Sequence, residues 1–174
     1  MHAWYSRPGP GDAELAGAVA VPSFSPAALQ ALVEADQAAR QGPIDWERLR
    51  VEDARRRVVV RGWVAAEAIQ APVDQWRAAL IFQHGRSVED FELAHRLAAA
   101  SAAAGHDPAR WLEAATEDRW RLARGLPQRW GTQYQDNDGR WELAPVDPAT
   151  TDAERAARGL PSLAEARAGA ASRR

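Results

Sequence analysis

The chain has 174 residues, a net charge of −2 and an isoelectric point near 6.1, so its length fits one ordinary domain and its charge does not indicate a general nucleic-acid binder. All 22 basic residues are arginine, which excludes lysine Schiff bases and the lysine of phosphate-binding loops. The absence of cysteine excludes disulfides, thiolate nucleophiles and cysteine-bound metal centres.

The first 24 residues are predicted to form an irregular N-terminal arm, because Pro8-Gly9-Pro10-Gly11 and Pro22 disfavour regular structure. Residues 25–174 are predicted to form a single α-helical domain. The beginning of the chain lacks the basic region and the long apolar stretch of a secretory signal, and Ala16–Val21 is too short to span a bilayer. We therefore expect a cytoplasmic protein with no membrane partner and no nucleic-acid partner.

Four predicted helices each carry one strongly polar residue at a position where the apolar stripe should continue. These helices are predicted to begin near Ser25, Asp45, Val73 and Asp107. The four polar residues are Asp36, Asp53, His84 and Arg119. A charged or titratable group on a core-facing surface is costly unless it is paired or used, so these positions are the first candidates for chemistry.

The second of these helices is expected to end at about Val60, before Arg61-Gly62-Trp63. It contains the run Arg55-Arg56-Arg57, which is interpreted as a solvated face because three successive residues spread over most of a helix circumference. Another helix, rich in alanine, is predicted after the capping-box spacing of Ser87 and Asp90.

The helical period stops after Gly125, and the segments 130–135 and 140–144 flank a glycine-containing turn. This pattern predicts a β-hairpin. Two short helices are expected beyond it, one over residues 152–158 and one after Ser162. The predicted fold is therefore mainly α, a compact single-domain helical fold with one small β-hairpin near the C-terminal third.

Familiar catalytic signatures are missing from the sequence, including the nucleophile elbow, the zinc-binding helix motif and the dinucleotide-binding glycines. Three polar features remain: Gln83-His84, Asp118-Arg119 and the segment 127–134. In that segment amides, a hydroxyl and aromatic rings surround Gly131, which allows backbone N–H groups to approach a ligand closely. Aromatic strand residues also commonly fill a hairpin core, so that interpretation stays open.

Six short motifs occur in a fixed order along the chain. They are Gly62-Trp63, Gln83-His84, Asp118-Arg119, Pro127-Gln128, Gly131-Thr132-Gln133 and Arg158-Gly159-Leu160-Pro161-Ser162-Leu163. In these motifs the chain resembles a bacterial family of uncharacterised proteins, a domain of unknown function, from about residue 30 to the end. The resemblance implies no reaction, but it implies a shared polar set at Asp53, Gln83, His84, Asp118, Arg119, Gln128, Thr132 and Gln133.

The first functional hypothesis is a cofactor-independent enzyme that acts on a small molecule or a peptide by hydrolysis, elimination, cyclisation or isomerisation. His84 would be the general acid/base, because the pKa of histidine is closest to neutrality. Asp53 or Asp36 would orient it, and Arg119 would hold a carboxylate or a developing oxyanion. The predicted substrate-binding residues are Gln83, Asp118, Gln128, Thr132, Gln133, Trp130 and Asp36.

Two alternatives remain open. A metal-dependent enzyme could use His84, Asp36 and Asp53 as ligands, although no pair of them has a diagnostic spacing, and no metal is assigned. A non-catalytic binding or interaction module could instead contain the same residues as a buried polar network that fixes the helix register. An enzyme requires Asp53, His84 and Arg119 around one open cavity, with Gly131-Thr132-Gln133 as a wall, whereas a structural network would be closed and internally paired.

Overall fold

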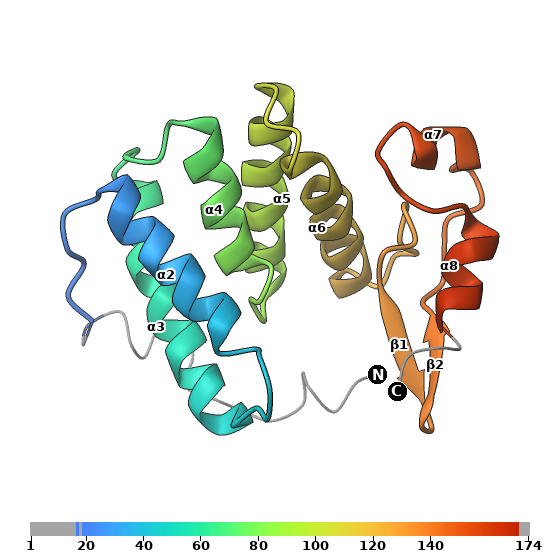
Figure 1. The fold of residues 1–174 in the computed structure, drawn as a ribbon, viewed down its shortest axis with the longest axis horizontal. Coiled ribbons are helices and arrows are strands. Elements are labelled where there is room, and N and C mark those ends of the chain that lie inside the picture. The colour runs from blue at the N-terminus through green and yellow to red at the C-terminus, as the bar shows by residue number, and fades with distance from the viewer. Residues whose placement is uncertain (1–16, 18, 171–174) are drawn as a thin grey trace.

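The structure is a computed structural model that describes residue 17 and residues 19–170. These residues form seven α-helices and one two-stranded antiparallel sheet (Figure 1). The elements are α2 (Pro26–Ala38), α3 (Trp46–Ala65), α4 (Pro72–Phe82), α5 (Val88–Ala103), α6 (Ala109–Ala123), β1 (Tyr134–Asn137), β2 (Arg140–Leu143), α7 (Asp152–Ala156) and α8 (Leu163–Ala170). The predicted fold class, mainly α with a small hairpin in the C-terminal third, is confirmed.

Helices α4, α5 and α6 stand side by side in the middle of the molecule (Figure 1). Helices α2 and α3 pack on the α4 side of this row, and the hairpin with α7 and α8 lies beyond α6. The molecule therefore has an N-terminal helical half and a smaller C-terminal part, and polar candidate residues occur in both.

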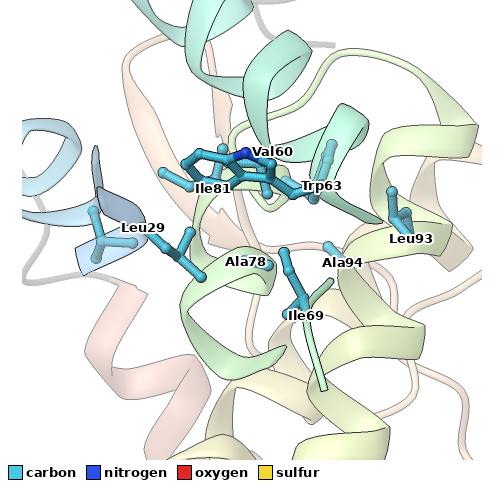
Figure 2. Close-up of a cluster of buried hydrophobic side chains, with 10 residues drawn as sticks. Leu29, Val60, Trp63, Ile69, Ala78, Ile81, Leu93 and Ala94 are labelled. Atoms are coloured by element: carbon cyan, nitrogen blue, oxygen red, sulfur yellow. The ribbon is translucent and has the colours of Figure 1, made fainter. Parts of the chain in front are cut away.

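The main hydrophobic core fills the N-terminal half (Figure 2). It is built from the buried residues Leu29, Val33, Val60, Trp63, Ile69, Ala78, Ile81, Phe82, Leu93 and Ala94. The indole N–H of Trp63 donates to the carbonyl of Pro22 at 2.7 Å, and the ring of Phe24 meets that indole edge to face at 5.5 Å between centroids. The end of the predicted N-terminal arm thus packs on α3, whereas residues 1–16 and 18 lie outside the described residues.

Most predicted helix starts are confirmed by their caps. Ser25 accepts from the backbone N–H of Ala28, Asp45 accepts from that of Arg48, and Ser87 with Asp90 forms a complete capping box. Asp107 does not cap α6, because the helix begins one residue later and the Asp107 carboxylate pairs with Arg110 at 3.2 Å.

The predicted end of the second helix at Val60 is wrong, since α3 continues through Gly62 to Ala65. A Cβ on Gly62 would lie 2.8 Å from Cγ1 of Val21, so this glycine allows the preceding segment to approach the helix. Glycine weakens a helix without ending it, and here the burial of Trp63 on the same turn favours continuation.

The hairpin is shorter than predicted and begins at Tyr134. Its two-residue turn has Asp138 at φ 53° and Gly139 at φ 84°, the positive dihedrals of a type I′ turn. Tyr134 pairs with Leu143 at the open end of the register. No helix among the described residues has the length and apolar character needed to cross a membrane.

Candidate functional site

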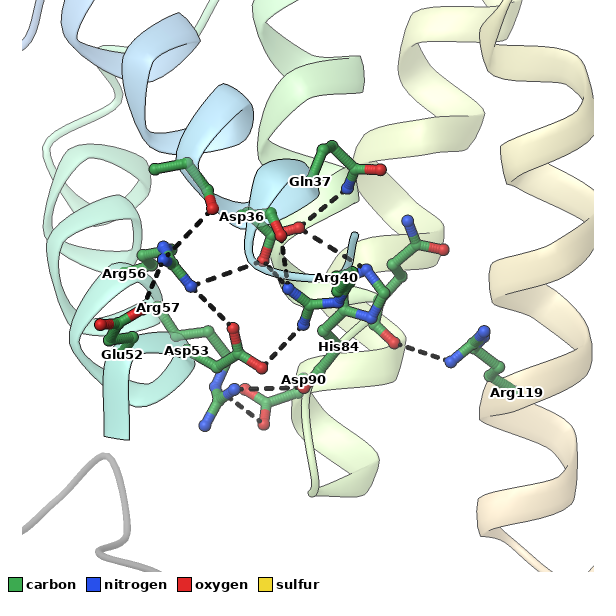
Figure 3. A network of polar contacts seen from close by, with 12 residues as sticks. Asp36, Gln37, Arg40, Glu52, Asp53, Arg56, Arg57, His84, Asp90 and Arg119 are labelled. Atoms are coloured by element: carbon green, nitrogen blue, oxygen red, sulfur yellow. Dashed lines mark hydrogen bonds and ion pairs between the residues drawn. The ribbon is translucent and has the colours of Figure 1, made fainter. Parts of the chain in front are cut away.

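Asp36 lies at the C-terminal end of α2, with its side chain only 1% exposed, and it is the centre of a polar network (Figure 3). Arg40 donates to both its carboxylate and its main-chain carbonyl at 2.8 Å, and the amide of Gln37 donates to its second carboxylate oxygen at 2.8 Å. Burial raises the pKa of Asp36 to about 6, with a further upward contribution from Asp53, although Arg40 and Arg56 act in the opposite direction.

The network extends from α2 to α3 through two arginines. Arg40 also donates to Asp53 at 2.7 Å, so it bridges the two carboxylates. Arg56 donates to Asp53 at 2.9 Å and to Glu52 at 3.1 Å, and it lies 4.0 Å from Asp36. Arg40 therefore connects the carboxylates of Asp36 and Asp53, and the Asp53 carboxylate is held between two cations (Figure 3).

His84 lies in the turn that follows α4, and its Nε2 atom is 3.7 Å from the Asp36 carboxylate. Its side chain is 22% exposed, so it is partly accessible to solvent. Burial is the largest cause that holds the pKa of His84 well below its usual range, followed by the positive charges of Arg40, Arg119, Arg57 and Arg56. At neutral pH the imidazole is therefore neutral and able to accept a proton.

The turn that carries His84 is held by arginines from two other helices. Arg119 of α6 donates to the carbonyl of Gln83 at 3.1 Å, and Arg57 of α3 donates to the carbonyl of His84 at 3.2 Å. The last carbonyls of a helix have no partner within it and carry partial negative charge, so cations stabilise this end of α4. Arg119 thus contacts the backbone beside His84, and the predicted oxyanion role would need it to bind a ligand in addition.

Asp118 belongs to a second buried network in α6. Its fully buried carboxylate accepts from the backbone N–H groups of Arg129, Trp130 and Thr132 at 2.7–2.9 Å and from the Thr132 hydroxyl at 2.7 Å. Gly131, at φ 73°, lets the loop close around the carboxylate. Burial raises the pKa of Asp118, while these hydrogen bonds act to lower it.

The other predicted substrate-binding residues of this loop make internal bonds as well. The Gln128 amide donates to the carbonyls of Gln133 and Ala144 and accepts from the Gln133 N–H, at 2.8–2.9 Å. The Gln133 amide donates to the Thr132 hydroxyl at 2.9 Å, and Trp130 donates to Glu117 at 2.6 Å. The strand begins only at Tyr134 because these bonds hold the preceding residues against α6 and one another.

The structure therefore divides the predicted site residues into two groups. Asp36, Asp53, His84, Gln83 and Arg119 come together at the ends of α2 and α4, whereas Asp118, Gln128, Trp130, Thr132 and Gln133 form the loop beside α6. Asp53, His84 and Arg119 are linked through Arg40, Asp36 and the turn after α4, whereas the shared cavity expected around them stays a prediction. The expected role of Thr132 and Gln133 as a wall beside His84 stays a prediction.

A cavity of about 490 Å³ lies between helices α5 and α6 and the C-terminal part, and none of its lining residues is His84. It is lined by Ala99, Ala102, Ala103, Arg110, Glu113, Arg129, Trp130, Glu154, Ala157 and Arg158. Arg158 pairs with Glu113 across it at 2.6 Å, and the guanidinium groups of Arg129 and Arg158 lie over the Trp130 ring. Of the predicted site residues only Trp130 lines this cavity. Its indole N–H already donates to Glu117.

Sequence reasoning missed several arginines and one acid that the structure places around His84. Arg56 and Arg57 are buried, so the interpretation of Arg55-Arg56-Arg57 as a solvated face is wrong for two of its three residues. The spacing of Arg56 three residues after Asp53 was a usable signal, because such residues are neighbours on one helix face. Arg57 pairs with Asp90, and that contact joins residues far apart in sequence.

The metal-ligand set considered for His84, Asp36 and Asp53 is not assembled in the part of the chain that the structure describes. No group of three or more histidine and acidic side chains there could hold a metal ion. The carboxylates of Asp36 and Asp53 face arginines instead, and these cations would repel a metal ion.

The chain matches no family model and has no significant match among curated proteins or solved structures. The resemblance to a bacterial family of uncharacterised proteins therefore stays a prediction.

Proposed function

We propose that this protein is an enzyme that uses His84 as an acid/base group on a small-molecule or peptide substrate. The observation that carries the proposal is the 3.7 Å contact between Nε2 of His84 and the buried carboxylate of Asp36. A neutral imidazole beside a carboxylate can act as a general base when its second nitrogen reaches substrate. A cytoplasmic location belongs to the same proposal.

Each residue has a specific role in this proposal. Asp36 faces the imidazole and stabilises the imidazolium that forms when His84 takes a proton, and the other ring nitrogen, Nδ1, is assigned to the substrate. Asp53 acts through Arg40 and is a positioning residue. The surrounding guanidinium groups favour negative charge that develops on a substrate during proton removal. Hydrolysis, elimination, cyclisation and isomerisation all fit these roles.

The test uses His84→Gln, which keeps hydrogen-bonding capacity, and His95→Gln as a matched histidine control elsewhere in the fold. Both variants are assayed against a panel of carboxylate-bearing small molecules, esters, amides and short peptides, with product formation followed by mass spectrometry. For any substrate that the native protein turns over, His84→Gln should lower kcat on the order of a hundredfold. His95→Gln should retain turnover. Equal turnover by the two variants would contradict the proposal.

A second candidate is a non-catalytic module, and one observation favours it. The carboxylates of Asp36, Asp53 and Asp90 are all paired with arginines, as in a closed structural network. In that case the native protein turns over no member of the panel, and His84→Gln should lower the free energy of unfolding by about 1–3 kcal/mol, because a buried partner loses its contact. Urea denaturation of the same two variants separates the two functions.

A further inference from the structure

The turn that carries His84 contacts two buried charged residues, Arg57 and Asp90. Neither residue has a direct role in the proposed acid/base chemistry. Arg57 of α3 and Asp90 of α5 are 3% and 4% exposed, and the Arg57 Nε atom lies 3.7 Å from the Asp90 carboxylate. Nη1 of the same guanidinium donates to the His84 carbonyl at 3.2 Å. The planar guanidinium of Arg57 therefore connects Asp90, in the first turn of α5, to the backbone of His84.

Asp90 is itself fixed from several directions. Its carboxylate accepts from the backbone N–H groups of Arg86 and Ser87 at 3.0 and 3.3 Å, and it pairs with Arg61. A Cβ on Gly85 would overlap the Asp90 side chain, so the glycine after His84 is needed for this close approach. Asp90 is therefore held in place, and its contact with Arg57 can keep the Arg57 guanidinium on the His84 carbonyl.

From these contacts we infer that Arg57, anchored by Asp90, is a positioning residue that holds the His84 imidazole against Asp36. The carbonyl that it binds belongs to the same residue as the imidazole, so a change in that contact rotates or releases the ring. Arg119 holds the preceding carbonyl, of Gln83, in the same way from the opposite side. The turn thus has one restraint from α3 and one from α6. The inference rests on the proposed function only for its effect on turnover.

Three variants separate positioning from charge. Arg57→Gln removes the cation and the contact with the carbonyl, Arg57→Lys keeps the cation but loses the planar two-sided geometry, and Arg55→Gln removes an exposed charge from the same helix as a control. The pKa of His84 and its ring resonances are followed by NMR, which needs no substrate. Turnover is measured where a substrate has been found.

Arg57→Gln should raise the pKa of His84 relative to Arg55→Gln, because one of the positive charges that disfavour the imidazolium is gone. Arg57→Lys should keep that pKa low, yet shift or broaden the His84 ring resonances and lower kcat about tenfold with KM nearly unchanged. If Arg57→Lys keeps the native ring resonances and kcat, Arg57 acts only through its charge and the inference is wrong. The inference is also wrong if the pKa of His84 is the same in Arg57→Gln and Arg55→Gln.

Failure of the inference and failure of the proposed function give different results. If Arg57→Lys disturbs the His84 ring but His84→Gln leaves turnover intact, the positioning is real and the proposed chemistry is wrong. If His84→Gln abolishes turnover but Arg57→Lys behaves as the native protein, the chemistry stands and the inference falls. Arg57→Lys retains a cation beside Asp90, so the buried Asp90 carboxylate keeps a positive charge next to it and the variant should still fold.

Discussion

The two most informative acids in this protein are Asp36 and Asp118, and their surroundings differ in kind. Both carboxylates are buried and both have a raised pKa. Asp118 is held by three backbone N–H groups and one hydroxyl from a single loop, whereas Asp36 faces the side chains of Arg40, Arg56 and His84. Backbone donors are fixed by the fold, while side-chain charges can move, titrate and exchange partners.

This difference separates a structural carboxylate from one suited to chemistry. The loop around Asp118 uses the donors and acceptors of Gln128, Thr132 and Gln133 internally, so its bonds stabilise the attachment of the hairpin to α6. The network at Asp36 includes a neutral imidazole that is partly exposed. We therefore expect substitutions at Asp118 to change stability and substitutions at Asp36 and His84 to change protonation and turnover.

The largest expected effect on stability is that of Asp118→Ala. The substitution leaves three backbone N–H groups without their acceptor, and the free energy of unfolding should fall by about 3 kcal/mol or more. Urea denaturation measures this loss, with Asp107→Ala at an exposed position as the control. A similar small change in both variants would mean that the loop does not depend on the carboxylate.

Gly131→Ala should have the next largest effect, because two costs add. The residue has φ 73°, and a Cβ there would also overlap the guanidinium of buried Arg155. Gly125→Ala is a matched control, since it has the same φ with open space around the Cβ. We expect a loss of about 1–2 kcal/mol for Gly125→Ala from the left-handed backbone alone, and a clearly larger loss for Gly131→Ala. Equal losses would show that Arg155 moves aside freely.

The sequence predicted the helices well because caps and apolar periods are local signals. The capping box of Ser87 and Asp90 and the Asp138-Gly139 turn act over a few residues, and both occur as the residue types suggest. The division of the polar residues between two networks was not predictable. Asp118 and Arg119 are adjacent in sequence, yet successive helix residues point in directions about 100° apart and reach different partners. Which partners they reach is a property of the packed fold.

The burial of Arg57 shows the same limit at a single position. A run of three arginines on a helix is typical of a solvated surface, and Arg55 is indeed exposed. Arg57 is buried because Asp90 and the His84 carbonyl, both distant in sequence, supply its partners. A sequence period identifies the face of a helix, but a buried charge depends on what another element brings to it.

The raised pKa of Asp36 predicts a smaller effect, a fall in the free energy of unfolding as the pH rises. The folded-state pKa of Asp36 is raised from 3.8 to about 6, so the folded protein binds this proton more tightly than the unfolded chain. The contribution of Asp36 to stability is therefore fully present below about pH 4 and is lost as the pH rises to about 6, by about 1–3 kcal/mol. The free energy of unfolding of the native protein relative to Asp36→Asn should fall across this window. A difference that rises instead would mean that the arginines outweigh burial.

The most direct measurement is an NMR titration of His84 in the native protein, with His84→Gln used to assign its ring resonances. Burial and the surrounding arginines should keep the pKa of His84 well below 6.5, so that the ring stays neutral throughout the physiological range. That result would support a neutral base beside Asp36. A pKa above the physiological pH would show a charged imidazole held in an ion pair with Asp36, and it would contradict the assignment of His84 as a general base.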